Sequence, residues 1–165
     1  MTVHSAAVLG PLSVAVLTIS DSRSLSDDPS GDFLARGVAL KGHRLADRRL
    51  VRDDQEQIRS ALEGLLAAAQ VVISTGGTGL AGRDVTVPVV ASLLTAPLPG
   101  FGELFRMLSY QEIGPAAMLS RALGGRAGAA LLFALPGSLA AVRLGWEQLL
   151  APELPHLVWE LLRQG

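Results

Sequence analysis

Three short apolar runs, each ending abruptly at a polar or glycine-rich segment, constrain the fold of this chain more than any other feature of its sequence. They cover residues 14–19, 71–74 and 129–135. None alternates between apolar and polar residues as a half-exposed strand does, so each is predicted to be a central strand buried on both faces. Strands of this kind occur in parallel sheets whose two faces are covered by helices.

Helical apolar spacing fills most of the chain between these runs. Helices capped by Ser30, Asp54 and Ser138 are predicted to extend to residues 40, 66 and 149. Further helices are predicted over residues 86–94, 103–110, 113–123 and 153–163, and a more polar edge strand over Arg44–Val51. This alternation predicts an α/β fold with a mainly parallel sheet and helices on both of its faces.

The length of 165 residues suits one domain, because two halves would each bury too little surface to be stable. We predict a tail over residues 1–12 and a single domain over residues 13–165. The net charge of −1 argues against nucleic acid or a membrane surface as a partner. Residues 6–19 lack the basic flank of a signal peptide, and no apolar run approaches the ~20 residues of a membrane span. Since cysteine is also absent, we expect a cytoplasmic protein without disulfides or thiolate chemistry.

Candidate ligand-binding groups follow the predicted strands where each one ends. Loops begin at Ser20, Thr75 and Pro136, and Asp53 follows the edge strand. In open parallel sheets, ligands bind beyond the carboxyl ends of the strands. The sequence therefore predicts one binding site where these four segments meet.

The most distinctive of these loops is Thr75-Gly76-Gly77-Thr78-Gly79. Its glycines let a ligand approach the backbone N–H groups, and its threonines add hydroxyls, which suits an anion or a flat polar ring. Residues 77–82 also match G-x-G-x-x-G, the only support for a nucleotide-dependent oxidoreductase. However, the loop follows the third strand rather than the first, and Glu103 follows a Pro/Gly connection instead of ending the next strand. A P-loop is excluded because Arg83-Asp84 stands where lysine and a hydroxyl residue are required.

Together with the following Arg83-Asp84-Val85-Thr86, this loop closely resembles the signature of the MoaB/MogA family of molybdenum-cofactor synthesis proteins. Other segments similar to the family follow in the same order: Asp28-Pro29-Ser30-Gly31, Gly100-Phe101-Gly102-Glu103, Ser120-Arg121 and Leu135-Pro136-Gly137-Ser138. The run ELFRMLSYQEIG, from Glu103 to Gly114, looks most like the MoaB branch. The resemblance extends over about residues 14–150.

What this resemblance implies is a three-layer α/β/α sandwich that assembles into a homo-oligomer, a trimer or, in the MoaB branch, a hexamer. It implies that the chain binds molybdopterin and adenylylates it with ATP and Mg²⁺, releasing pyrophosphate, before a partner protein inserts molybdenum. The alternative is an oligomer that carries molybdopterin without using ATP. After Thr86 the family often continues Pro-Glu-Ala, whereas this chain reads Val87-Pro88-Val89, and the missing carboxylate favours the alternative.

At the matched positions, the resemblance assigns catalysis and Mg²⁺ binding to Asp53 and Asp84. This is chemically adequate, because Mg²⁺ takes one or two carboxylates together with phosphates and waters. The resemblance assigns contacts with molybdopterin or phosphate to Ser20, Thr75, Gly76, Gly77, Thr78, Gly79, Glu103, Ser109, Gly137 and Ser138.

Both aspartates also have a purely structural alternative. Asp53 could cap the following helix or pair with Arg52, since aspartate is a preferred cap. Asp84 could pair with the adjacent Arg83, an interaction of little energetic value at a surface.

Alternatives exist for other polar residues as well. Glu103 could be a first-turn acid that offsets a helix dipole, and Ser138 could be an N-cap whether or not it meets phosphate. Arg106 and Arg121 could contact phosphate or pair with Glu112.

Overall fold

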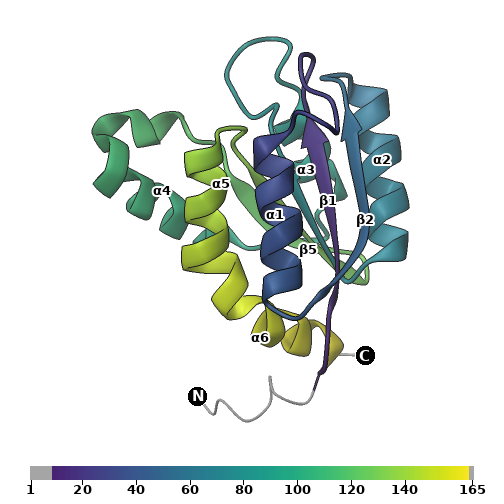
Figure 1. The fold of residues 1–165 in the computed structure, drawn as a ribbon. Coiled ribbons are helices and arrows are strands. Elements are labelled where there is room, and N and C mark those ends of the chain that lie inside the picture. The colour runs from purple at the N-terminus through teal and green to yellow at the C-terminus, as the bar shows by residue number, and fades with distance from the viewer. Residues whose placement is uncertain (1–8, 164–165) are drawn as a thin grey trace.

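A computed structural model describes residues 9–163 and shows a six-stranded sheet between two layers of helices (Figure 1). The elements are, in chain order, β1 (Ser13–Ile19), α1 (Pro29–Leu40), β2 (Arg44–Val51), α2 (Gln55–Ala68), β3 (Val71–Thr75), α3 (Thr86–Leu93), β4 (Ala96–Pro97), α4 (Pro99–Ile113), the 3₁₀ helix η2 (Gly114–Leu119), β5 (Leu123–Ala127), β6 (Ala130–Leu135), α5 (Leu139–Gly145), the π-helical turn η3 (Trp146–Leu150) and α6 (Ala151–Leu162). Residues 1–8 of the predicted tail and residues 164–165 of the predicted domain lie outside the described part.

The sheet has the strand order β2-β1-β3-β6-β5-β4. The first four strands of this order are parallel, whereas β5 runs antiparallel to β6 and β4 antiparallel to β5. The prediction of an α/β fold with a mainly parallel sheet is therefore confirmed. Thr18 of β1 is paired with Thr75 of β3, which is paired with Leu135 of β6, so the three central strands end at the same edge.

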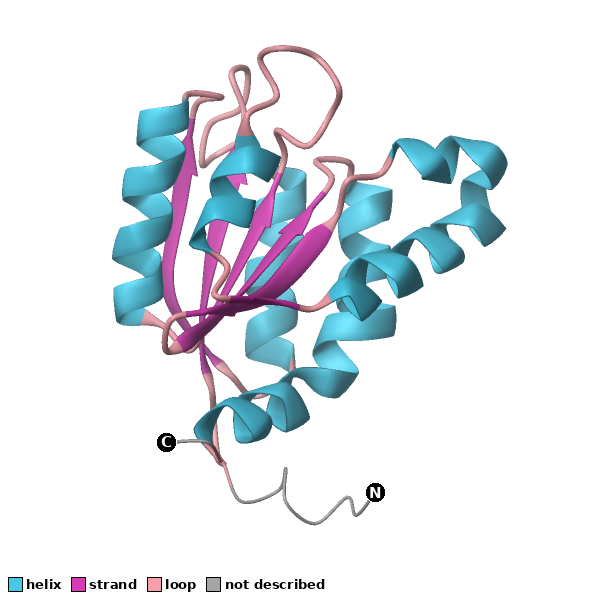
Figure 2. Ribbon diagram, turned by 180° about the vertical axis from the view of Figure 1, so that it is seen from behind, coloured by secondary structure: helices cyan, strands magenta, loops and turns pink. Residues whose placement is uncertain are grey.

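Helices cover both faces of the sheet, as the sequence predicted. Successive residues of a strand point to opposite faces, and along β1 Val14 and Val16 belong to one core while Ala15 and Leu17 belong to the other. The first core lies under α1, α4, α5 and α6, and the second under α2 and α3. Figure 2, seen from behind, shows α2 and α3 on the second face.

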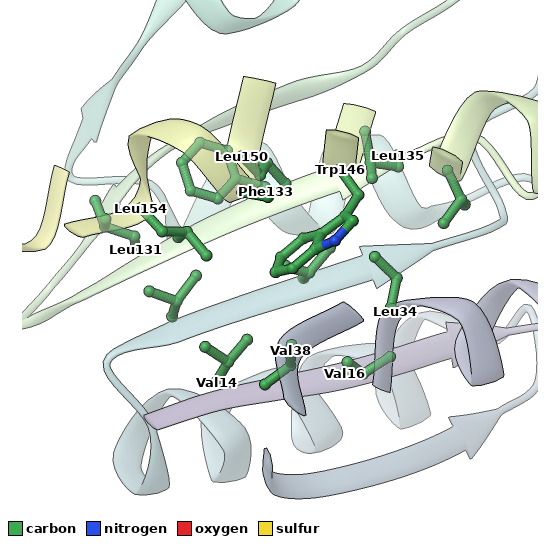
Figure 3. Packing of buried hydrophobic residues seen from close by; sticks show 14 of the residues in the cluster. Val14, Val16, Leu34, Val38, Leu131, Phe133, Leu135, Trp146, Leu150 and Leu154 are labelled. Atoms are coloured by element: carbon green, nitrogen blue, oxygen red, sulfur yellow. The ribbon is translucent and has the colours of Figure 1, made fainter. Parts of the chain in front are cut away.

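Trp146 is the largest side chain of the first core. It is 3% exposed, and Figure 3 shows its indole between α1 and the sheet, near Leu34 and Leu135. Gly37 makes this packing possible, because a Cβ atom at that position of α1 would lie 2.5 Å from Nε1 of Trp146. Glycine at this position of the helix therefore leaves the space that the aromatic ring occupies.

Two predicted helix ends need correction. The cap of α1 is Asp28 and not Ser30: Oδ1 of Asp28 accepts a hydrogen bond of 3.0 Å from the N–H of Gly31, and Pro29 occupies the first turn. The two helices predicted after Ser138 are continuous, joined through the turn η3.

The segment between α3 and β6 also differs from the prediction. Residues 97–102 were predicted as a connection and 103–110 and 113–123 as two helices, whereas α4 begins at Pro99 and a strand, β5, occupies Leu123–Ala127. A Cβ atom on Gly124 would lie 2.2 Å from the ring of Phe133, and one on Gly125 would lie 2.4 Å from the carbonyl oxygen of Ala96. Glycine has low strand propensity, so the strand is selected by these close approaches and not by local preference.

No helix within residues 9–163 has both the length and the apolar character needed to cross a membrane.

The contact between Gly37 and Trp146 predicts opposite effects for two glycine substitutions in helices. Gly37→Ala is expected to lower the free energy of unfolding by about 1–3 kcal/mol, because the added methyl group overpacks the buried indole. Gly64→Ala in α2 is the matched control, since its Cβ would meet only the flexible end of Arg49, and it is expected to raise stability by about 0.5–1 kcal/mol. Urea unfolding measures both, and equal stabilities would mean that Trp146 moves aside without cost.

Candidate functional site

A cavity of about 780 Å³ lies at the edge where β1, β3 and β6 end. Its wall is formed by the loop after β1, the glycine loop of residues 75–84 after β3, and residues 136–138 after β6. Side chains of α4 and η2 complete it. Figure 1 shows the three loops above the strand ends, with α4 to one side. The four segments predicted to meet therefore do so.

Nearly all of the predicted site residues line this cavity: Ser20, Asp53, Thr75, Gly76, Gly77, Thr78, Gly79, Asp84, Ser109, Gly137 and Ser138. Glu103 is the exception. It is exposed on α4 and does not line the cavity. Because α4 begins at Pro99, Glu103 lies outside the first turn, so the alternative of a first-turn acid is wrong as well.

The glycine loop leaves β3 through two residues in the left-handed region, with φ of 100° at Gly76 and 65° at Gly77. A Cβ atom on Gly76 would lie 2.1 Å from the carbonyl oxygen of Ile19. One on Gly77 would lie 2.2 Å from Oγ1 of Thr86 and 2.5 Å from Oδ1 of Asp53. Both positions therefore require glycine for conformation and for space.

Hydrogen bonds join the glycine loop to the loop after β6. The N–H of Gly76 donates to the carbonyl oxygen of Leu135 over 3.1 Å. The hydroxyl of Thr75 donates to the carbonyl oxygen of Pro136 over 2.9 Å, and that of Ser30 to the carbonyl oxygen of Gly137 over 2.9 Å. Thr75 is 1% exposed, so its hydroxyl proton fixes the loops and is not free for a ligand.

The loop after β1 positions Asp53. Oδ1 of Asp21 accepts a hydrogen bond of 3.1 Å from the N–H of Asp53. Oγ of Ser20 accepts from the N–H groups of Ser22 and Arg23, at 3.2 and 3.1 Å, which closes the loop into a turn. Ser20 therefore shapes the loop that holds Asp53 in place.

A buried acid that the sequence interpretation did not assign to the site lies in the cavity wall. Asp28 is 2% exposed, and its Oδ2 accepts hydrogen bonds from Oγ1 of Thr18 at 2.6 Å and from Nη2 of Arg48 at 3.0 Å. Arg48 comes from the edge strand β2 and also pairs with Asp32. The charge of Asp28 is thus fully compensated, which marks it as a structural support of the cavity.

Asp53, in contrast, lies in an unfavourable electrostatic environment. Burial raises the pKa of its carboxyl above the ordinary value of 3.8, and the negative charges of Asp21 and Asp84 raise it further. Arg83 opposes this effect, but the direction stays upward. Within residues 9–163, neither Asp53 nor Asp84 forms an ion pair, so the alternative pairings with Arg52 and Arg83 are not formed.

The donor atoms around Gly77 fit a cation. Oδ1 of Asp53 and Oγ1 of Thr86 are buried and have no hydrogen-bond partner among the described residues, and both face the position of a Cβ atom on Gly77. Likewise, a Cβ atom on Gly79 would lie 2.6 Å from Oδ2 of Asp84. Residues 9–163 contain no group of three or more acidic, histidine or cysteine side chains that could hold a metal ion. A hard cation here would therefore depend on two carboxylates, with phosphates and waters as its other ligands.

The remaining alternatives from the sequence are decided by hydrogen bonds. Asp54 and not Asp53 caps α2, since its Oδ1 accepts from the N–H of Gln57 at 2.9 Å. Ser138 is the cap of α5 and lines the cavity as well. Arg106 and Arg121 donate to backbone carbonyl groups and form no ion pair with Glu112.

Comparison with known proteins agrees with this geometry. Residues 15–156 match the family described as "Probable molybdopterin binding domain". The chain is 46% identical over 152 residues to molybdenum cofactor biosynthesis protein B of Bacillus cereus, covering 90% of each chain. It is 40% identical over 146 residues to the protein of the same name from Escherichia coli, covering 87% of this chain and 86% of the other. The chain belongs to the MoaB/MogA family.

Solved structures of MoaB proteins have the same fold. A crystal structure of molybdenum cofactor biosynthesis protein B superposes with a TM-score of 0.90 at 44% identity, covering 93% of this chain and 98% of the other. The tungsten cofactor synthesizing protein MoaB from Pyrococcus furiosus superposes with a TM-score of 0.83 at 32% identity, covering 92% and 97%. The predicted MoaB/MogA-like three-layer fold is therefore confirmed.

Family resemblance also offered a signal for the residues that site prediction missed. Asp28 and Ser30 belong to a segment that matches the MoaB/MogA pattern, and both line the cavity. Thr18 carries no such signal, because it lies inside a continuous apolar strand and its role follows only from its hydrogen bond to Asp28.

The raised pKa of Asp53 predicts that Asp53→Asn stabilises the protein at pH 7. An upward shift means that the native state binds the proton more tightly than the unfolded state, so the ionised carboxylate opposes folding above the raised pKa. We expect a melting temperature roughly 2 °C above that of the wild type at pH 7. The gain should vanish as the pH falls through the raised pKa toward 3.8, where the wild-type carboxyl is also neutral.

Thermal melts between pH 3.5 and pH 7 measure this effect. Asp54→Asn is the control, because asparagine caps a helix as well as aspartate does. A gain of the same size and pH dependence in Asp54→Asn would show that the position of Asp53 in the cavity has no special effect.

Proposed function

We propose that this chain is a molybdopterin adenylyltransferase. In the proposed reaction an oxygen of the molybdopterin phosphate attacks the α-phosphorus of ATP, the bond to the β-phosphate breaks and pyrophosphate leaves. The observation that supports this most is the meeting of Asp53 and Asp84 at the glycine loop, inside one cavity. Phosphoryl transfer needs reactants held in line and negative charge neutralised more than it needs covalent help, and such a site suits both needs.

Asp53 and Asp84 are the residues that would hold Mg²⁺, with the hydroxyl of Thr86 nearby. Mg²⁺ would supply neutralisation of phosphate charge when bound. Oδ1 of Asp53 and Oγ1 of Thr86 favour this assignment because they are buried without a hydrogen-bond partner in residues 9–163, whereas most buried polar atoms of a protein have one. The raised pKa of Asp53 agrees with it, since a nearby cation favours the ionised form and lowers the pKa again.

Molybdopterin and phosphate groups are proposed to bind the backbone of residues 76–79, Gly137 and the capped start of α5 at Ser138. The cavity of about 780 Å³ has the size of a small-molecule site. Ser109 lines the cavity from α4, and its hydroxyl would orient the pterin. We do not retain Glu103 for that role, because its side chain lies outside the cavity.

A second candidate function is a carrier that binds molybdopterin without using ATP. The observation that favours it is the sequence Val87-Pro88 in the first turn of α3, directly after the buried hydroxyl of Thr86. The family often has glutamate in this turn, and this chain supplies no carboxylate there. Binding would be retained in such a carrier because the backbone N–H groups of the glycine loop do not require a carboxylate in this turn.

The proposed enzyme is a homo-oligomer that passes its product to a molybdenum-inserting partner protein in the cytoplasm. Support for the oligomer comes from α4 and η2, which together we call the arm and which project from the body of the molecule (Figures 1 and 2). The arm exposes large apolar side chains: Leu104, Met107, Tyr110, Ile113, Met118 and Leu119. Large exposed apolar patches mark interaction surfaces.

Asp84→Asn tests the transferase. We expect the rate of pyrophosphate release from ATP, Mg²⁺ and molybdopterin to fall at least about a hundredfold, because the carboxylate charge is lost. The fold should persist, since an amide oxygen can still accept the hydrogen bond of 3.2 Å that Oδ2 of Asp84 receives from the N–H of Ala81. Asp54→Asn serves as the matched control and should keep wild-type turnover.

Adenylylated molybdopterin is measured in parallel with pyrophosphate by chromatography. Retained turnover in Asp84→Asn would rule out the assigned role of Asp84. Molybdopterin binding by the wild type without any ATP-dependent product would instead establish the carrier.

Met107→Glu tests the oligomer. Met107 is 53% exposed on the arm, and a charge there is expected to reduce the molar mass measured by light scattering without changing the circular dichroism spectrum. Leu40→Glu at the end of α1, where the side chain is 86% exposed, is the control and should leave the mass unchanged. An unchanged mass in Met107→Glu would place the subunit interface elsewhere.

A further inference from the structure

The tip of the glycine loop is not part of any helix or strand, although it forms one wall of the cavity. Residues 76–84 lie between β3 and α3, and their own hydrogen bonds join the N–H of Asp84 to the carbonyl oxygen of Ala81 and the N–H of Thr86 to that of Gly77. The carbonyl oxygens of Thr78 and Gly79 take part in neither bond. Both carbonyl oxygens can therefore accept hydrogen bonds from outside the loop.

Arg121 provides this support from a position 43 residues further along the chain. Its Nε donates to the carbonyl oxygen of Thr78 over 3.0 Å, and its Nη2 donates to the carbonyl oxygen of Gly79. The planar guanidinium can bind two neighbouring oxygens at once, as a lysine ammonium cannot. Because C=O and N–H point in opposite directions across a trans peptide, fixing these two carbonyls also fixes the N–H groups of Gly79 and Leu80.

A second arginine anchors the segment that carries Arg121. Nη1 of Arg106 on α4 donates to the carbonyl oxygens of Ser120 and Ala122, at 3.3 and 3.0 Å, on either side of Arg121. Gly102 gives it the room, since a Cβ atom there would lie 2.6 Å from Nη2 of Arg106 and 2.7 Å from the carbonyl oxygen of Ala122. Gly102 of the matched segment therefore leaves the space that this anchor needs.

The guanidinium groups of both arginines donate their hydrogen bonds to backbone carbonyl oxygens. Within the described part of the chain, no carboxylate lies at ion-pair distance from Arg106 or Arg121. Arg121 is not among the cavity-lining residues either, so it is not placed to bind phosphate directly. The hydrogen bonds run from α4 to residues 120–122 and then to the glycine loop, which joins two walls of the same cavity.

We propose that Arg121 is a positioning residue, anchored by Arg106, that holds the glycine loop in its ligand-binding conformation. Its effect on catalysis rests on the proposed adenylyltransferase function, whereas its effect on the loop does not. The arm contributes Phe105, Ser109 and Leu119 to the cavity, so tying it to Thr78 and Gly79 also sets the separation of these two walls.

The test compares Arg121→Gln with Arg126→Gln. Arg126 is exposed on β5, and among the described residues its guanidinium donates only to the carbonyl oxygen of Gly128, so its replacement removes the same charge without touching the loop. In Arg121→Gln we expect hydrogen exchange of a peptide spanning residues 76–86 to become roughly tenfold faster, because two charge-assisted hydrogen bonds are lost. Exchange in β1 and β6 should stay as in the wild type.

In Arg121→Gln we expect the kinetic effect to appear in KM rather than in kcat. With the loop loosened at Thr78 and Gly79, the KM for molybdopterin should rise roughly tenfold while kcat changes less than about threefold. Asp53 lies outside the loop, and Asp84 keeps its hydrogen bond from the N–H of Ala81, so both carboxylates should stay near their positions. Arg121→Lys keeps the charge without the planar fork and should give intermediate exchange and KM. It also serves if Arg121→Gln folds poorly.

Loop exchange and KM like those of Arg126→Gln, in either folded Arg121 variant, would overturn the proposal. Faster exchange across the whole sheet in both variants would make Arg121 a residue of global stability and would overturn it equally. If the wild type releases no pyrophosphate, the adenylyltransferase proposal fails, but the exchange of residues 76–86 still decides the role of Arg121.

Discussion

Gly76 lies so close to the end of β1 that the rest of the site depends on this contact. A Cβ atom there would lie 2.1 Å from the carbonyl oxygen of Ile19, and a backbone φ of 100° turns the chain away from β3 at once. Because β1, β3 and β6 end in register, this turn directs the glycine loop over the ends of its neighbouring strands. Gly77 is then near both Asp53 and Thr86, and Gly79 is near Asp84. Any side chain at Gly76 or Gly77 would displace the groups that give the cavity its chemistry.

Two acids in the cavity wall show how function differs from structural support. Asp28 receives hydrogen bonds from Thr18, from the N–H of Gly31 and from Arg48, so its burial is compensated by the protein itself. Asp53 instead lies near the negative charges of Asp21 and Asp84, which Arg83 only partly offsets. Its pKa is raised, and one of its oxygens has no partner among the described residues. Carboxyl groups in such positions destabilise the folded state, and proteins retain them where a ligand supplies the missing compensation.

Arginines near a cavity proposed to bind phosphate groups are commonly interpreted as phosphate ligands. Here Arg106 and Arg121 bind backbone carbonyl oxygens, and their charges order the segment between α4 and the glycine loop. The cavity therefore has one wall made of strand-end loops and another made of the arm, and the hydrogen bonds of Arg106 and Arg121 connect the two walls through residues 120–122. The apolar exterior of the arm overlaps with this wall only in part. Met107 and Met118 are exposed and do not line the cavity, Phe105 and Ser109 line it and are buried, and Leu119 is both exposed and part of the lining.

Local sequence determined the features that depend on neighbours along the chain. Buried runs became β1, β3 and β6, the caps at Asp54 and Ser138 formed as predicted, and strand-end loops gathered one site because parallel strands end at one edge. Prediction from local sequence was wrong where a contact between distant residues overrode the local preference. The strand β5 exists because Gly124 fits the ring of Phe133, and Asp28 rather than Ser30 caps α1 because Arg48 and Thr18 compensate its charge. Tertiary structure alone also decided that Glu103 lies outside the cavity, because the direction of a helix is not encoded within its own segment. The same holds for the hydrogen bond from Arg121 to Thr78, 43 residues away, because the partner of a long side chain is not encoded locally either.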